Sequence, residues 1–140
     1  MTKYFRLDPE VPGELGPNTV MDRSVHPPRV SHLHFLFTDW LGDCLVQSFP
    51  CFLISEDALD ALLQLSLTGF SSDLAELGEG DGFRHFNPDA SVPRFLWLKV
   101  SGVPCRDDFG LSSDGDLVIS DRVLWVLEEK GLSMCEVTAL

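Results

Sequence analysis

Hydrophobic and polar positions follow the same pattern in two stretches of the chain, residues 53–72 and residues 118–137. Each stretch begins with apolar residues, reaches a serine followed by an acidic residue, and then repeats leucine at a spacing of three. The leucines line one side of a helix. Ser55 and Ser120 stand just before these helices, where a hydroxyl can accept a hydrogen bond from a free backbone N–H. Each stretch then turns back into extended chain, so the pattern predicts two strand–helix–strand units.

The two stretches align without a gap, which indicates an internal repeat. The matching positions include Ile54 with Ile119, Ser55 with Ser120, Glu56 with Asp121, Leu59 with Leu124, Leu62 with Leu127 and Leu67 with Leu132. Two copies are too few for a solenoid, so we expect two related halves that share one core. Gly131 follows the second predicted helix, at a position where a left-handed backbone favours glycine.

Other segments predict further strands. Residues 3–7 predict a short first strand. Residues 92–100 have apolar side chains on both faces, which predicts a central strand with Pro93 at its start. Residues 30–37 alternate, which predicts a half-buried antiparallel strand with Leu33, Phe35 and Phe37 on one side and two histidines on the other.

Two segments follow neither periodicity. Residues 8–18 contain three prolines and two glycines, which predicts an extended surface arm. Residues 71–91 are the most polar part of the chain and predict a mobile loop. With six or seven short strands and two principal helices, the 140 residues predict a single α+β domain with a mixed or mainly antiparallel sheet.

The composition adds a strong negative charge. The formal net charge is −12 and the isoelectric point is about 4.4. Such a surface repels nucleic acid and anionic membranes and attracts basic proteins, although it can also serve solubility alone. The four cysteines form no C-x-x-C pair, and we expect reduced thiols in a cytoplasmic protein. No apolar run approaches the ~20 residues of a membrane-spanning helix.

The candidate chemistry is sparse. His32 and His34 lie on one side of a predicted strand, as metal ligands do, but no third ligand has a matching spacing. Solvated or partner-facing histidines are therefore favoured, and we expect no metal or cofactor. The kinase-like triplet Asp108-Phe109-Gly110 occurs without the other kinase motifs and is attributed to chance.

The acidic residues concentrate in predicted loops, and if these loops lie on one side of the molecule they form a carboxylate patch for a basic protein. Trp125 takes the place of Asp60 in the repeat and lies off the apolar side of its helix. It is either covered by the N-terminal arm, which we favour, or exposed as a binding anchor. The candidate partner-binding residues are Glu76, Glu79, Asp81, Asp107, Asp108, Asp114, Asp116 and Trp125.

The repeat pattern Ile-Ser-acid-x-x-Leu-x-x-Leu, followed by Leu-Thr-Gly-Phe or Leu-Ser-x-Cys-Glu, resembles the closing segment of a family of bacterial immunity proteins. These proteins are encoded beside polymorphic and type VI secretion toxins. The opening residues 4–8, residues 94–100 and residues 107–111 are also similar to this family, so the resemblance covers about half of the chain. It implies a non-enzymatic protein that binds one cognate toxin in the cytoplasm of the producing cell, and it supplies no catalytic residue.

Three hypotheses therefore stand. The first is an acidic immunity protein that blocks a basic toxin. The second is a small enzyme that uses His32 or His34 with a loop carboxylate, for which a pocket lined by these groups would be the sign. The third is an adaptor module of a secretion system.

Overall fold

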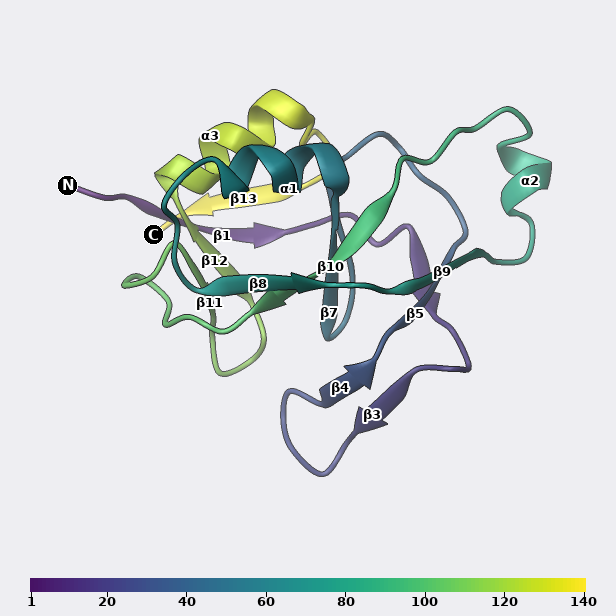
Figure 1. Ribbon diagram of the computed structural model, residues 1–140, viewed down its shortest axis with the longest axis horizontal. Helices are drawn as coiled ribbons and strands as arrows, with labels where there is room; N and C mark the ends of the chain where they lie inside the picture. The colour runs from purple at the N-terminus through teal and green to yellow at the C-terminus, as the bar shows by residue number, and fades with distance from the viewer.

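A computed structural model describes all of residues 1–140 (Figure 1). The fold is α+β and mainly antiparallel, as predicted, with three helices and more strands than expected. The helices are α1 (Glu56–Leu63), α2 (Phe83–Phe86) and α3 (Asp121–Lys130). One four-stranded sheet has the order β11 (Phe109–Leu111), β12 (Leu117–Ser120), β1 (Tyr4–Asp8), β13 (Glu136–Ala139). The other has the order β6 (Leu45–Ser48), β7 (Cys51–Ser55), β10 (Phe95–Val100), β8 (Phe70–Asp73).

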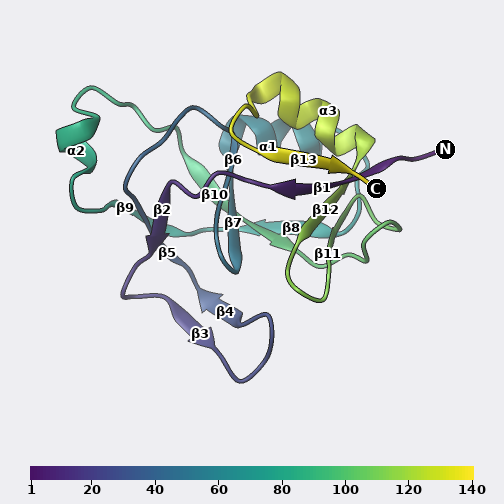
Figure 2. The same ribbon diagram turned by 180° about the vertical axis from the view of Figure 1, so that it is seen from behind.

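Two smaller sheets complete the fold. A three-stranded sheet has the order β2 (Gly13–Leu15), β5 (His34–Phe37), β9 (Glu76–Glu79). A hairpin pairs β3 (Val20–Asp22) with β4 (Arg29–His32). The predicted strand over 30–37 is therefore divided into β4 and β5, and β5 pairs antiparallel with β2 but parallel with β9. The hairpin projects away from the helices (Figures 1 and 2).

Both strand–helix–strand units form at the predicted places, as β7–α1–β8 and β12–α3–β13. In neither unit do the two strands pair with each other. A strand from elsewhere in the chain lies between them and is antiparallel to both: β10 in the first unit and β1 in the second. Because β6 lies beside β7 as β11 lies beside β12, the two four-stranded sheets have the same topology.

The pairing register is also repeated. Phe95 of β10 lies opposite Ser55, and Tyr4 of β1 lies opposite Ser120. In both units the first N–H of the helix donates to the carbonyl just before the inserted strand, at 2.9 Å. The repeat therefore extends beyond the two aligned stretches to β1 and β10.

The two N-cap predictions have different outcomes. The Ser55 hydroxyl accepts a hydrogen bond from the N–H of Ala58 at 3.3 Å, as predicted. Ser120 also stands at the N-cap, but the predicted capping bond is absent, because its hydroxyl instead donates to Oδ1 of Asp108 at 2.7 Å. Gly131 ends α3 with a φ of +114°, a conformation that other residues rarely adopt.

The turn after each helix is held by an aspartate of the other unit. Asp43, just before β6, is buried and accepts hydrogen bonds from the N–H groups of Ser133 and Met134, both at 2.8 Å. Asp108, just before β11, accepts from the N–H of Thr68 at 3.0 Å. The arrangement is reciprocal, so each half is fastened to the other at an equivalent place.

The apolar residues form two buried clusters. The larger lies between the two helices and both four-stranded sheets, and it joins residues of both repeat units such as Ile54 and Ile119. The smaller lies on the other face of β7 and β10, where Leu53 and Trp97 pack against Phe35 of β5. The predicted central strand is thus confirmed as β10, with apolar residues on both faces, but it begins at Phe95 rather than at Pro93.

Two loop predictions need correction. Residues 71–91 hold most of β8, all of β9 and helix α2, because their sparse apolar residues, such as buried Phe83, are enough to fix these short elements. The arm over 8–18 contains β2 and a parallel bridge between Glu10 and Val46. No helix is long and apolar enough to cross a membrane.

Candidate functional site

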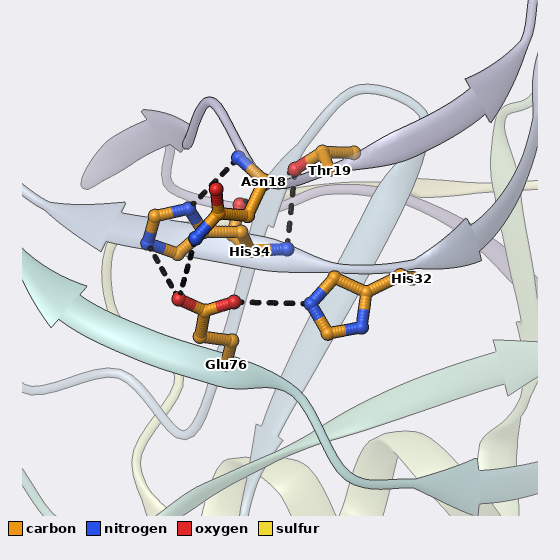
Figure 3. A network of polar contacts seen from close by, with 5 residues as sticks. All are labelled: Asn18, Thr19, His32, His34 and Glu76. Carbon is orange, nitrogen blue, oxygen red and sulfur yellow. Dashed lines mark hydrogen bonds and ion pairs between the residues drawn. The ribbon is translucent and has the colours of Figure 1, made fainter.

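The two histidines singled out in the sequence converge on one carboxylate (Figure 3). Nε2 of His32 lies 3.0 Å from Oε1 of Glu76, and Nε2 of His34 lies 3.6 Å from its Oε2. The side chain of Asn18 donates to Oε2 at 3.0 Å. These hydrogen bonds, first that of His32 and then that of Asn18, lower the pKa of Glu76. The constellation combines a predicted partner-binding residue with the histidines of the enzyme hypothesis.

The chain fixes the ring of His34 from several directions. The backbone N–H of Asn18 donates to Nδ1 at 3.2 Å. The hydroxyl of Thr19 accepts from the N–H of His34 at 3.1 Å and donates to its carbonyl at 2.9 Å. Gly16 packs against the ring so closely that a Cβ there would lie 2.2 Å from Nδ1. His34 is buried by these contacts, whereas the side chain of His32 is half exposed.

These contacts specify the tautomer of His34. Because Nδ1 accepts a hydrogen bond, the proton of the neutral ring lies on Nε2, which faces Glu76. A metal ion on Nε2 would require the proton to move to Nδ1, where it would meet the N–H of Asn18. The network therefore suits hydrogen bonding rather than metal ligation. No group of three or more His, Cys, Asp or Glu side chains is placed to hold a metal ion.

The network also lies outside the hollows of the surface. The largest hollow, of about 420 Å³, lies between β9, α2 and residues 90–94. Neither histidine nor Glu76 lines this or any other hollow. These groups therefore do not line the pocket that would have indicated an enzyme.

The cysteines are poorly suited to nucleophilic chemistry. Burial raises the pKa of the Cys44 and Cys51 thiols to about 12 and that of Cys135 to about 11. At neutral pH these three thiols stay protonated, whereas the thiolate is the nucleophile. All four cysteines are free, and Cys105 is exposed on its loop.

The two other acidic residues near β9 differ in their contacts, because one forms an ion pair and the other is exposed. Glu79 forms a two-pronged ion pair with Arg84 of α2, with Nε 2.9 Å from Oε2. Asp81 is exposed in the turn that follows β9.

The acidic residues near β11 divide into structural and free groups. Asp107 accepts from the N–H of Val103 at 2.7 Å, which lowers its pKa, and Asp108 fastens the turn at Thr68. Both carboxylates therefore hold loops together. Asp114 and Asp116 are exposed in the turn between β11 and β12.

These two acidic groups do not form one patch. Figures 1 and 2 place β9 and α2 at one end of the long axis, and β11 with its loops toward the other. The predicted acidic loops do not all lie on one side of the molecule, so they do not form a single carboxylate patch.

Trp125 is exposed, so the favoured prediction that the N-terminal arm covers it is wrong. Its side chain is 63% exposed on the outer face of α3. The arm runs instead beside β6 and β5. Trp125 shares a hollow of about 390 Å³ with Leu65, Asp121 and Arg122. Asp121 and Arg122 lie one turn before Trp125 on α3, whereas Leu65 follows α1, and the sequence had no means of pairing it with Trp125.

No protein-family model matches the chain, and no curated protein matches it either.

Proposed function

We propose that this protein is an immunity protein, which binds a basic antibacterial toxin and blocks it in the cytoplasm of the producing cell. The observation that carries the proposal is the surplus of negative charge that the molecule leaves unpaired. The chain has 22 Asp and Glu residues against 10 Lys and Arg residues. Five of the cations already pair with a carboxylate, so most carboxylates have no cationic partner within the molecule.

Unpaired charge of one sign increases the rate and the specificity of binding to a surface of the opposite sign. Toxins that act on nucleic acids or nucleotides must themselves attract phosphate, and a basic active site suits an acidic inhibitor. The resemblance of the repeat units to immunity proteins supports the same function. Inhibition would follow from occlusion, which requires no catalytic group on this chain.

The experiment is co-expression with the product of the neighbouring gene, where the resemblance to immunity proteins implies that the toxin is encoded. We expect the protein to restore growth and to form a stable complex that weakens when salt rises from about 50 mM to about 200 mM, because added ions screen exposed charges. A toxin that is neither bound nor inhibited would overturn the proposal. Binding without inhibition would favour the adaptor hypothesis instead.

A second candidate function rests on the convergence of two histidines on Glu76, which could orient His32 as a general base. A growth assay separates the two functions. If protection against the toxin depends on catalysis by this network, His32→Ala and Glu76→Gln should abolish it. If it acts by occlusion, both variants should protect as the wild type does, provided that they fold.

A further inference from the structure

The two long helices form a layer whose outer face is open. α1 and α3 lie side by side and run antiparallel (Figures 1 and 2). At one end, Nζ of Lys130 lies 3.2 Å from Oδ2 of Asp57. At the other end, the hollow beside Trp125 joins Leu65, which follows α1, to the first turn of α3. The layer is therefore one continuous surface made by both repeat units.

The repeat provides an internal control for Trp125. The equivalent residue of α1 is Asp60, which is also exposed, in a unit with the same topology and register. A helix at this place in the fold therefore tolerates an aspartate. The indole is therefore not needed to build the unit.

The outer face has an apolar end and an acidic end. Trp125 and Leu65, which are 63% and 37% exposed, make the apolar end, with Asp121 and Arg122 beside them. At the other end, Glu128 and Glu129 are exposed in the last turn of α3, beside the first turn of α1 with Asp57. Tryptophan is among the side chains that most often dominate protein–protein binding.

We propose that the outer face of α1 and α3 is the docking surface for the toxin, an inference that rests on the proposed function. The occupant is a basic segment of the toxin that lies along the helix pair. It inserts an apolar side chain beside Trp125 and Leu65, and it places Lys or Arg side chains against Glu128 and Glu129. The net charge of the two ends fixes this direction, because Asp121 lies next to Arg122 at the Trp125 end, whereas Glu128 and Glu129 form no ion pair.

The first test compares the wild type with two variants, Trp125→Asp and Phe86→Asp, in binding to the purified product of the neighbouring gene. Trp125→Asp introduces the residue that α1 already carries at the equivalent position. We expect it to weaken binding roughly 30-fold, the loss typical of a buried anchor. Phe86→Asp is the matched control, because Phe86 is 76% exposed on α2 at the far end of the molecule. It should change the dissociation constant less than about twofold.

The charged end has its own test. Glu128→Lys combined with Glu129→Lys should weaken binding about tenfold at low salt, and the difference should shrink as ionic strength rises.

Far-UV circular dichroism and thermal unfolding should be unchanged in the Trp125→Asp variant, because Asp60 is tolerated at the equivalent place.

Fluorescence gives a second measurement that does not depend on a variant. Trp97 is buried and Trp40 is half-buried, so Trp125 is the tryptophan most open to quenchers. Toxin binding should protect its emission from acrylamide.

An unprotected indole, or equal effects of Trp125→Asp and Phe86→Asp on binding, would overturn the docking surface but leave the proposed function intact. If the wild-type protein does not bind the toxin, both proposals fail.

Discussion

At the scale of single residues, short carboxylates in this protein serve the backbone as often as they face solvent. Asp43 and Asp108 stand in loops and carry the charge of a binding residue, yet both accept hydrogen bonds from N–H groups in turns of the other half. A carboxylate that accepts backbone N–H groups is strongly held, because hydrogen bonds to charged groups exceed those between neutral groups. Reversing the charge at Asp108 would therefore disturb the fold before it could report on a partner.

Asp43→Ala tests this structural role. The substitution removes the acceptor of two part-buried hydrogen bonds, those from the N–H groups of Ser133 and Met134, and we expect it to lower the free energy of unfolding by about 1–3 kcal/mol. Urea unfolding provides the measurement. Asp60→Ala, at an exposed position without a recorded partner, should change stability by less than about 0.5 kcal/mol. Equal effects of the two substitutions would contradict the structural role of Asp43.

Glu76 predicts a dependence on pH. Its pKa is lowered in the folded protein by the hydrogen bonds of His32 and then of Asn18. Its contribution to stability is therefore complete above the pKa of an unfolded glutamate, about 4.3, and is lost as pH falls through the lower folded value. The unfolding midpoints of wild type and Glu76→Gln should differ at pH 6 and converge toward about pH 3. A difference that persists unchanged in acid would show that another property of Glu76 is responsible.

At the scale of elements, what the sequence predicted were local features, and what it missed were contacts between distant segments. The two helices and their flanking strands follow from leucine spacing, an N-terminal serine and a turn, all within about 20 residues of one another. The insertion of β1 and β10 into the repeat units has no local signal, because strand partners are chosen by the sheet as a whole. The short strands β8 and β9 were missed because exposed polar residues hide their two-residue period.

The candidate site divides in the same way. Alternation over residues 30–37 correctly placed Leu33, Phe35 and Phe37 in the core. The prediction of a solvated histidine is wrong for His34, which the segment around Asn18 buries. The sequence had no means of pairing these histidines with Glu76, which belongs to a parallel strand 42 residues beyond His34. It did single out Trp125, because an internal repeat makes a departure from the pattern visible without any relative to compare.

Ser55 and Ser120 offer a prediction at this scale, since equivalent serines have different partners. Ser55→Ala should cost about 1 kcal/mol, the usual value of an N-cap, and this cost should be independent of Asp108. Ser120→Ala should be coupled to Asp108→Ala by about 1.5–3 kcal/mol, because the pair shares a charge-assisted hydrogen bond. Double-mutant cycles of urea unfolding measure both couplings. Additive effects in the Ser120 cycle would contradict the assigned bond.

At the scale of the whole molecule, charge and stability are in opposition. A net charge of −12 on 140 residues makes the compact state repel itself, and only five of the cations form ion pairs that offset the repulsion. Exposed pairs add little to stability, with a typical value of about 0–1 kcal/mol each. The folded protein thus keeps an unfavourable charge that a basic partner would relieve.

This opposition predicts opposite responses to salt. Between about 10 mM and about 200 mM sodium chloride, screening should weaken self-repulsion and raise the melting temperature by a few degrees, equivalent to roughly 1 kcal/mol. The same change should weaken the complex with a basic toxin, because there the screened interaction is attractive. Thermal unfolding of the free protein and titration of the complex across one salt series measure both trends. If the melting temperature falls with salt, local ion pairs outweigh the net charge, and the electrostatic basis proposed for toxin binding loses its premise.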